Sequence, residues 1–326
     1  MIGCSAIAII SRPFANGAKT GDIGVNAVCQ SKRPRTLMTY ETSPLEIGLC
    51  SWSIGTTQIP RISSALTKLE LRAVHLALGP ILAAPATRRI AWINAIRKAP
   101  WIPTAAMIAF SGENYSSLET IRKTGGFVPE QHFMARVKKT VEAAKLCKKL
   151  GIKYLSTHVG FIPPVQNRAV YADFLNRLMH VSDLVAQQGV MLLFESGQES
   201  PETLASTMER LRRDHVGINF DPANILLYGH GDPVTAALVL APWIRHLHAK
   251  DCKLHPQATA NGWRGKDANL GQGEANLADV LRVLVSRSYH GPVIIERELG
   301  RVSIRQMAAD IAFLRNAIDH IRQANI

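Results

Sequence analysis

Short apolar runs alternate with longer amphipathic stretches along the chain from Ile47 onward. The longer stretches carry apolar residues at helical spacing, and two of them end on glycines that suit helix C-caps, Gly151 and Gly189. Continuous apolar runs separated by helices are typical of parallel strands in a sheet that is covered on both faces. We predict eight such strands, in the segments IGLCSW, AVHLAL, TAAMIAF, KYLSTH, VMLLFE, VGINFD, IRHLHAKD and PVIIER.

Eight strand–helix units in about 250 residues have the size of a TIM barrel, so we predict an α/β fold with a single (β/α)₈ barrel. An open, doubly wound sheet is the alternative, but no GxGxxG motif follows the first strand. The third and seventh units are the longest, and their additional residues follow the strand, at 111–131 and 252–274. Because loops after strands lie on the catalytic face of a barrel, we expect these two to cover the active site, unless they are mere loop variation.

We predict that residues 45–326 form one catalytic barrel domain and that residues 1–44 are a poorly ordered N-terminal extension. The extension is rich in turn-forming and charged residues. Its apolar segment SAIAII is short and follows no basic residue, so we expect no secretory signal. No apolar run reaches about 18 residues, the length that predicts a membrane span.

The chain has five cysteines, an odd number, and no pair of them has CxxC spacing. This pattern argues against a disulfide framework and against a cysteine zinc site. It fits a reducing compartment, so we predict a cytoplasmic protein.

The net charge of +13 allows a nucleic-acid surface, an acidic membrane surface or a site for anionic metabolites as the partner. The densest basic cluster lies at 138–149 in a helical stretch, and we interpret it as a solvated helix face. No nucleic-acid motif accompanies the charge. We therefore predict a small-molecule substrate, without nucleic acid or membrane as a partner, and leave a homo-oligomer open.

Four of the predicted strands end in a carboxylate or a histidine. In a barrel these positions form the C-terminal rim, where catalytic groups lie. Three carboxylates that face one another in a partly desolvated site repel unless protons, salt bridges or a cation relieve the repulsion. Oxygen and nitrogen ligands without sulfur suit Mn²⁺, Mg²⁺, Co²⁺ or Zn²⁺. We predict a site for one divalent metal ion, formed by Glu195, Asp221, His248 and Glu296.

Three further histidines lie in the predicted strands. His158 ends the fourth strand, where it is either a substrate contact or a hydrogen-bonded core residue. His246 lies one layer below the predicted ligands, because strand side chains alternate with period 2, and we expect it to support a ligand or to pack. His75 in the second strand is open to the same two interpretations.

Five motifs follow or include the predicted strand ends: FESGQESPETL, INFDPANILLYGHGDP, IRHLHAKD, LGQGEANLADVLRVL and GPVIIERE. Together they resemble the sugar phosphate isomerase/epimerase family, whose fold is the xylose isomerase-like TIM barrel. The resemblance runs from about Ile47 to the C-terminus. It implies that the four rim residues bind one divalent metal ion and that Glu195 and Glu296 also act as the acid/base pair, as in ketose 3-epimerases.

The chain departs from the free-sugar members of that family at two positions. Asn224 stands where ketose epimerases that act on free sugars often have histidine, and it resembles the pentulose 5-phosphate 3-epimerase branch. Leu254 stands where free-sugar epimerases have an arginine. These departures favour a phosphorylated or otherwise anionic substrate, for which Lys250, Lys253 and Arg297 are candidate contacts beside His158 and Asn224.

We therefore predict a metal-dependent sugar or sugar phosphate isomerase or epimerase, which most simply epimerises carbon 3 of a ketose or ketose phosphate through an enediolate. An inosose dehydratase or a hydroxypyruvate isomerase on the same scaffold is the alternative. An apurinic endonuclease is disfavoured, because that family needs three metals and a histidine in place of Asn224. A catalytically dead sugar-binding barrel has no use for paired acid/base carboxylates.

Overall fold

The structure is a computed structural model that describes residues 44–298 and 303–324 of the 326-residue chain. Apart from Pro44, the predicted extension of residues 1–44 lies outside the described residues. The extension and the domain boundary at residue 45 therefore stay predictions.

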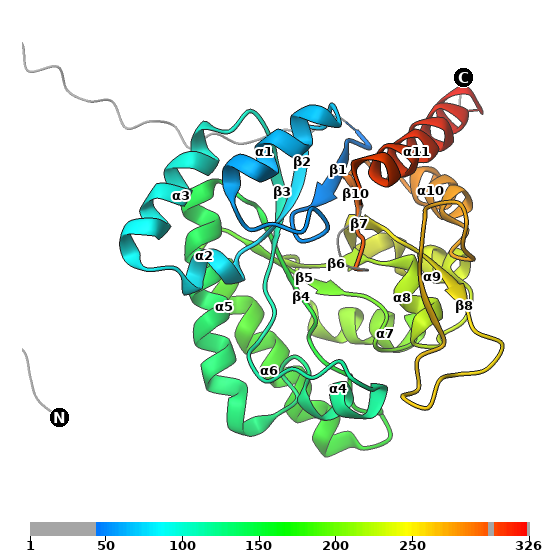
Figure 1. Cartoon of the computed structure of the whole chain (residues 1–326). Coiled ribbons are helices and arrows are strands. Elements are labelled where there is room, and N and C mark those ends of the chain that lie inside the picture. The colour runs from blue at the N-terminus through cyan, green and yellow to red at the C-terminus, as the bar shows by residue number, and fades with distance from the viewer. Residues whose placement is uncertain (1–43, 299–302, 325–326) are drawn as a thin grey trace, which may run out of the picture. The chain divides into compact units, whose positions relative to one another are not determined.

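Eight parallel strands close into a barrel in the order β1-β10-β7-β6-β5-β4-β3-β2 (Figure 1). Each predicted apolar run overlaps one of these strands, which confirms the (β/α)₈ barrel, although β3 begins two residues before the predicted run at Thr104. The strands have these bounds: β1 (Ile47–Cys50), β2 (Ala73–Ala77), β3 (Ile102–Met107), β4 (Tyr154–Thr157), β5 (Met191–Glu195), β6 (Val216–Phe220), β7 (Ile244–Ala249) and β10 (Val293–Ile295).

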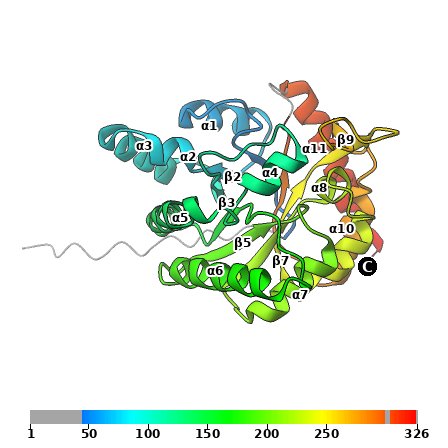
Figure 2. The ribbon, with the colours of Figure 1, turned by 90° about the horizontal axis from the view of Figure 1, so that it is seen from below.

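Helices follow the strands and surround the barrel, as the view from below shows (Figure 2). None of the described helices has both the length and the apolar composition that crossing a membrane requires. The helices are α1 (Ile59–Lys68), α2 (Gly79–Ala83), α3 (Ala86–Lys98), α4 (Leu118–Thr124), α5 (Glu130–Leu150), α6 (Arg168–Ala186), α7 (Pro201–Leu211), α8 (Pro222–Leu227), α9 (Pro233–Leu240), the 3₁₀ turn η1 (Ala241–Trp243), α10 (Leu277–Ser286) and α11 (Ile304–Ala324).

Local sequence explains why these segments are helical. The α5 helix ends where Gly151 adopts a left-handed φ of 72°, which costs glycine little. At the start of α7 the Ser200 side chain accepts a hydrogen bond from the Thr203 amide, which satisfies one of the free N–H groups of the first turn. The apolar residues of α11 recur every three or four positions and are buried against the barrel: Met307, Ile311, Leu314, Ile318 and Ile321.

The long segment after β7 contains an antiparallel hairpin that the sequence did not predict, formed by β8 (Asp251–Leu254) and β9 (Gly265–Ala268). The Asp251 carboxylate holds the chain beyond β9, because it accepts hydrogen bonds from the amides of Gly271, Gly273 and Ala275. A Cβ on Gly273 would lie 2.2 Å from the Asp251 carboxylate, so only glycine fits there.

The two long loops that the sequence predicts over the active site contact each other. The loop after β3 forms α4, where Ser117 and Thr120 make a capping box. The amide of Leu118 at the start of α4 donates a 3.0 Å hydrogen bond to the carbonyl of Asn261, between β8 and β9. A backbone hydrogen bond therefore joins the loop after β3 to the long segment after β7.

A buried ion network connects the end of β10 to β9 and α11. The Arg297 guanidinium lies 3.1 Å from the Asp267 carboxylate in β9 and 2.8 Å from the Asp310 carboxylate in α11, and it donates to Asn269. Asp310 in turn accepts a hydrogen bond from the amide of Leu270. The side chains of Arg297 and Asp310 are buried, so the network lies out of contact with bulk solvent.

Because removing one partner leaves an uncompensated buried charge, we expect Arg297→Met to lower the free energy of unfolding by about 3–5 kcal/mol. The matched control is Arg282→Met, which breaks an exposed i,i+3 pair with Asp279 and should change that free energy by about 0.5 kcal/mol or less. Urea unfolding of both variants measures the difference. Equal effects of the two substitutions would show that the Arg297 network contributes nothing special.

Candidate metal site and active-site cavity

The four predicted ligands converge at the carboxyl end of the barrel. Glu195 is the last residue of β5, Asp221 directly follows β6, His248 lies near the end of β7, and Glu296 directly follows β10. One ligand atom from each of the four lies within 4.8 Å of the other three. All four side chains are buried. The barrel thus brings together residues that are up to about one hundred positions apart in the sequence.

The donor set fits a divalent cation. The Nδ1 atom of His248 lies 3.0 Å from Oε1 of Glu195 and 3.3 Å from Oε2 of Glu296. Oδ2 of Asp221 is also buried and lies 3.4 Å from the Nζ of Lys250. One histidine and three carboxylates supply the nitrogen and oxygen ligands that divalent cations prefer. A cation between them would offset the excess of negative charge in the cluster.

The charges of the site compensate one another strongly. Burial acts to raise the pKa of Glu195, but the imidazole of His248 outweighs it and lowers that pKa. Burial also acts to raise the pKa of Glu296, and the cations of Lys250 and His248 hold it well below its usual range. The carboxylates in return raise the pKa of His248 well above its ordinary value. The carboxylates and the imidazole thus favour each other's charged forms.

Second contacts fix the two glutamates. The Ser156 hydroxyl donates a 3.2 Å hydrogen bond to Oε2 of Glu195, and the side-chain Nδ2 of Asn219 donates to the same oxygen. On the other side, the indole of Trp52 donates a 2.9 Å hydrogen bond to Oε1 of Glu296. Each glutamate consequently keeps one oxygen engaged and turns the other towards His248.

Lys250, which directly follows β7, is buried with its charge already paired. Its Nζ lies 3.1 Å from Glu296, 3.4 Å from Asp221 and 2.9 Å from Glu298, and it donates a 3.2 Å hydrogen bond to the side-chain oxygen of Asn224. Burial acts to lower the pKa of Lys250, but Asp221 and the glutamates raise it well above its ordinary value. Lys250 is therefore primarily a counter-ion of these carboxylates and only secondarily a candidate contact for a substrate anion.

A cavity of about 590 Å³ opens beside this cluster, and Glu296, His158 and Asn224 lie in its wall. This places His158 and Asn224 where a substrate could reach them. Arg297 does not line the cavity, because its guanidinium turns to the Asp267 and Asp310 carboxylates. The expectation that Arg297 contacts the substrate is corrected accordingly.

Four aromatic rings that no sequence motif singled out line the same cavity: Trp52, Tyr115, Tyr228 and Trp263. Tyr115 comes from the long loop after β3 and Trp263 from the long segment after β7, so both predicted loops reach the active site. The rings of Tyr228 and Trp263 pack edge to face with centroids 5.3 Å apart. Only the aromatic character of the two loops could have indicated this wall from the sequence.

Below the rim, a chain of buried polar groups crosses the barrel interior. Nε2 of His246 lies 3.0 Å from the Thr104 hydroxyl, and its Nδ1 lies 2.7 Å from the side-chain oxygen of Asn219. The side-chain nitrogen of Asn219 contacts Glu195 and so connects this chain to the four candidate ligands. His246 therefore occupies the supporting layer that the strand alternation predicts.

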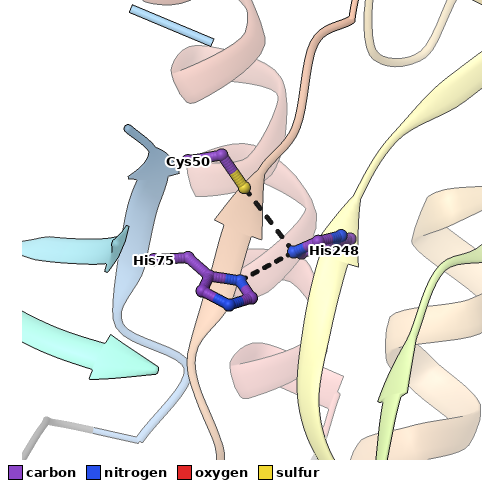
Figure 3. A group of neighbouring side chains, drawn as sticks. All are labelled: Cys50, His75 and His248. Atoms are coloured by element: carbon purple, nitrogen blue, oxygen red, sulfur yellow. Dashed lines mark hydrogen bonds between the residues drawn. The ribbon is translucent and has the colours of Figure 1, made fainter. Parts of the chain in front are cut away.

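A second cluster involves the opposite ring nitrogen of His248 (Figure 3). Nδ1 of His75 lies 2.8 Å and Sγ of Cys50 3.5 Å from Nε2 of His248. Both side chains are fully buried, and burial lowers the pKa of His75 to about 3 and raises the pKa of Cys50 to about 12. His75 is thus a neutral imidazole and Cys50 a neutral thiol at physiological pH.

A family model described as a xylose isomerase-like TIM barrel matches residues 115–317 of the chain. The chain belongs to this family. The membership confirms the resemblance that the sequence motifs indicated, and with it the type of barrel.

Solved structures agree on the fold. A xylose isomerase domain protein from Planctomyces limnophilus is 25% identical, with a TM-score of 0.75 over 86% of this chain and 98% of that chain. A D-tagatose 3-epimerase-like protein is 17% identical, with a TM-score of 0.67 over 86% and 100% of the two chains. A barrel protein from Mycobacterium smegmatis, solved in complex with magnesium, is 13% identical, with a TM-score of 0.64 over 86% and 98%. The last two likenesses show the fold alone.

A curated protein also matches over a short stretch. The 3-dehydroshikimate dehydratase of Bacillus anthracis is 36% identical over 83 residues. The match spans 24% of this chain and 29% of that protein, so the aligned part is less than a third of the relative.

We expect Asp221→Asn to remove most of the stabilisation by a divalent ion. Asparagine retains an oxygen for the helix cap that Asp221 provides to the amide of Asn224, but it lacks the charge. At about 100 times the dissociation constant, Mn²⁺ should stabilise the unaltered chain by about 2.7 kcal/mol, and the variant much less at the same concentration. Thermal unfolding with Mn²⁺ and with a chelator measures this.

Asp232→Asn is the control for the previous substitution, because Asp232 caps α9 in the same way outside the cluster. It should leave the Mn²⁺ effect intact. Equal Mn²⁺ stabilisation of both variants would argue that the ion binds elsewhere.

Proposed function

We propose that this protein is a metal-dependent isomerase or epimerase that moves a proton beside the carbonyl of a ketose. The observation that carries the proposal is the pair of buried glutamates, Glu195 and Glu296, which approach the same Nδ1 atom of His248 from β5 and from the end of β10. A divalent ion bound by the four-residue cluster supplies Lewis-acid stabilisation of the negative charge that develops on substrate oxygens as the proton leaves.

The two glutamates are suited to abstract and return the proton. One oxygen of Glu296 is held by Trp52, and Glu296 lies in the cavity wall, so its carboxylate is in reach of a bound substrate. Glu195 belongs to β5, which two other strands, β6 and β7, separate from β10 around the barrel. A proton taken by one carboxylate and returned by the other from a different side inverts the carbon, which is an epimerisation. We therefore propose 3-epimerisation of the ketose as the reaction.

The cavity favours an unphosphorylated ketose over a ketose phosphate. No lysine or arginine is among the described residues that line it, whereas Glu296 and Glu298 are. The Nζ atom of Lys250, the residue after β7, lies within 3.4 Å of each of three carboxylates. A phosphate dianion needs free cationic donors when it leaves water, and aromatic rings such as Tyr228 and Trp263 instead suit the C–H faces of a neutral sugar.

A dehydratase is the second candidate, and the partial match to a 3-dehydroshikimate dehydratase favours it. Such an enzyme also removes a proton beside a carbonyl, but a hydroxyl group then leaves from the neighbouring carbon. The buried acid/base groups would serve both reactions, so the fate of the hydroxyl separates the two proposals.

We also propose that the enzyme acts on small molecules in the cytoplasm. Within the described residues, Cys50, Cys147 and Cys252 are free and buried thiols, which fits a reducing compartment. A homo-oligomer stays a prediction.

Solvent deuterium should enter a ketose carbon without loss of water when the Mg²⁺-loaded protein is incubated with ketopentoses and ketohexoses in D₂O. Proton NMR measures this exchange. Glu195→Gln and Glu296→Gln should each slow it by about 10²–10⁴-fold, because each removes a proton-transfer group. Glu142→Gln on the exposed face of α5 is the control and should exchange at the unaltered rate. Formation of a dehydrated product would favour the dehydratase instead.

The proposed preference for neutral substrates predicts at least about a tenfold higher kcat/KM for the best free ketose than for its phosphate ester, a difference of about 1.4 kcal/mol in transition-state stabilisation. Coupled NMR assays on matched pairs of sugar and sugar phosphate test it. A higher kcat/KM for the phosphate would restore the phosphorylated substrate that Asn224 suggests.

A further inference from the structure

The far side of the His248 ring is enclosed by three side chains that the proposed reaction does not use. Nε2 of His248 lies 2.8 Å from Nδ1 of His75, 3.1 Å from the amide nitrogen of Asn219 and 3.5 Å from Sγ of Cys50 (Figure 3). Cys50 lies opposite His75 in the pairing of β1 with β2, so the two point to the same place from neighbouring strands. All of these side chains are fully buried.

The proton on His248 decides which ring nitrogen can bind a metal ion. A neutral imidazole has one N–H and one lone pair, and the nitrogen that ligates a metal must carry the lone pair. When Nδ1 binds an ion between Glu195 and Glu296, the ring proton of neutral His248 has to lie on Nε2 and needs an acceptor there. An acceptor on the opposite nitrogen fixes the tautomer and the ring orientation of a metal-binding histidine.

Only one of the three neighbours is a good acceptor. The Asn219 amide nitrogen is a donor, because its partner oxygen faces Nδ1 of His246 and the nitrogen itself donates to Glu195. The Cys50 sulfur is a weak acceptor at 3.5 Å. Nδ1 of His75 lies at 2.8 Å, within the usual range of a strong hydrogen bond, and it offers a lone pair when the His75 proton is on Nε2.

Packing holds the His75 ring in this orientation. Its centroid lies 4.7 Å from the ring of His246, 5.0 Å from that of His248 and 5.2 Å from that of Trp52. A side chain enclosed on several sides by other rings has few alternative rotamers, as a precise support for a ligand requires.

We propose that His75 is the positioning residue of the metal centre: its Nδ1 accepts the Nε2 proton of His248 and thereby commits Nδ1 of His248 to the ion. The inference rests on the proposed metal site and adds a residue on β2, on the far side of His248 from the glutamates.

The same cluster could instead be a second metal site, since Cys50, His75 and His248 offer three ligand atoms within 4.8 Å of one another. The distances argue against it. Two imidazole nitrogens on one tetrahedral zinc ion lie about 3.3 Å apart when each metal–nitrogen bond is about 2.0–2.1 Å. The observed 2.8 Å between His75 and His248 is a hydrogen-bond distance.

Co²⁺ binding to two substitutions of His75 tests the proposal. His75→Leu removes the acceptor, whereas His75→Asn places an amide oxygen near the position of the Nδ1 atom. We expect the leucine variant to bind Co²⁺ about 10–100-fold more weakly than the unaltered chain and to show a shifted visible absorption spectrum. The asparagine variant should restore the affinity to within a few-fold and the spectrum with it.

Leu76→Ala is the matched control for damage to the core, because Leu76 is buried in the same strand but makes no polar contact with the cluster. It should lower the thermal stability while the Co²⁺ affinity and spectrum stay unchanged. Thermal unfolding of the metal-free proteins, measured beside the titrations, separates a loss of folding from a loss of affinity.

Three results would overturn the proposal. Equal Co²⁺ affinity of the leucine variant and the unaltered chain removes the role of His75, while the proposed function stands. Two Co²⁺ ions per chain, with a sulfur-to-cobalt charge-transfer band that Cys50→Ser abolishes, would make His75 and Cys50 ligands of a second ion. Absence of any Co²⁺ binding to the unaltered chain would refute the proposed metal-dependent function together with the positioning role.

Discussion

The structure depends on one electrostatic constraint, the repulsion among carboxylates that are buried together at one end of the barrel. Glu195, Asp221 and Glu296 have left water, where each charge was well solvated, and they lie within a few ångströms of one another. Such an arrangement is stable only if positive charge and hydrogen-bond donors replace the lost water. Most of the surrounding polar groups can be understood as part of that replacement.

The replacement comes from elements that only the closed barrel brings together. Trp52 donates to Glu296 from the loop after β1, and Ser156 in β4 and Asn219 in β6 donate to Glu195. Lys250, which follows β7, supplies a cation to Asp221 and Glu296. None of these groups is close in sequence to the carboxylate it serves. One oxygen of each carboxylate and one ring nitrogen of His248 lie within 4.8 Å of one another, at the place where a divalent ion would bind. His248 and Lys250 supply the protein's own positive charge beside these oxygens.

The predictability of the site from the sequence follows from this geometry. The four rim residues could be predicted because the fold turns a one-dimensional property, the last polar residue of an apolar strand, into a shared location. The direction in which the Arg297 side chain points could not be predicted. It depends on Asp310 in the last helix and on Asp267 in a hairpin that no strand pattern indicated. The contact between His75 and His248 joins β2 to β7 across the interior, and only the stagger of the strands determines which residues meet there.

The charge of the whole chain therefore says little about the charge of the substrate. The chain carries an excess of thirteen positive charges, and among the described residues basic side chains such as Lys138, Lys145, Lys148 and Lys149 are exposed on α5. The charge at the cavity is negative instead. Glu298 adds a carboxylate to the three of the cluster, and Lys250 is the buried ammonium group that pairs with them. A divalent ion brings this site close to neutrality, and transfer of a substrate proton to a glutamate moves negative charge onto the substrate without changing the net charge of the site. A substrate without charge of its own is the one for which that step costs least.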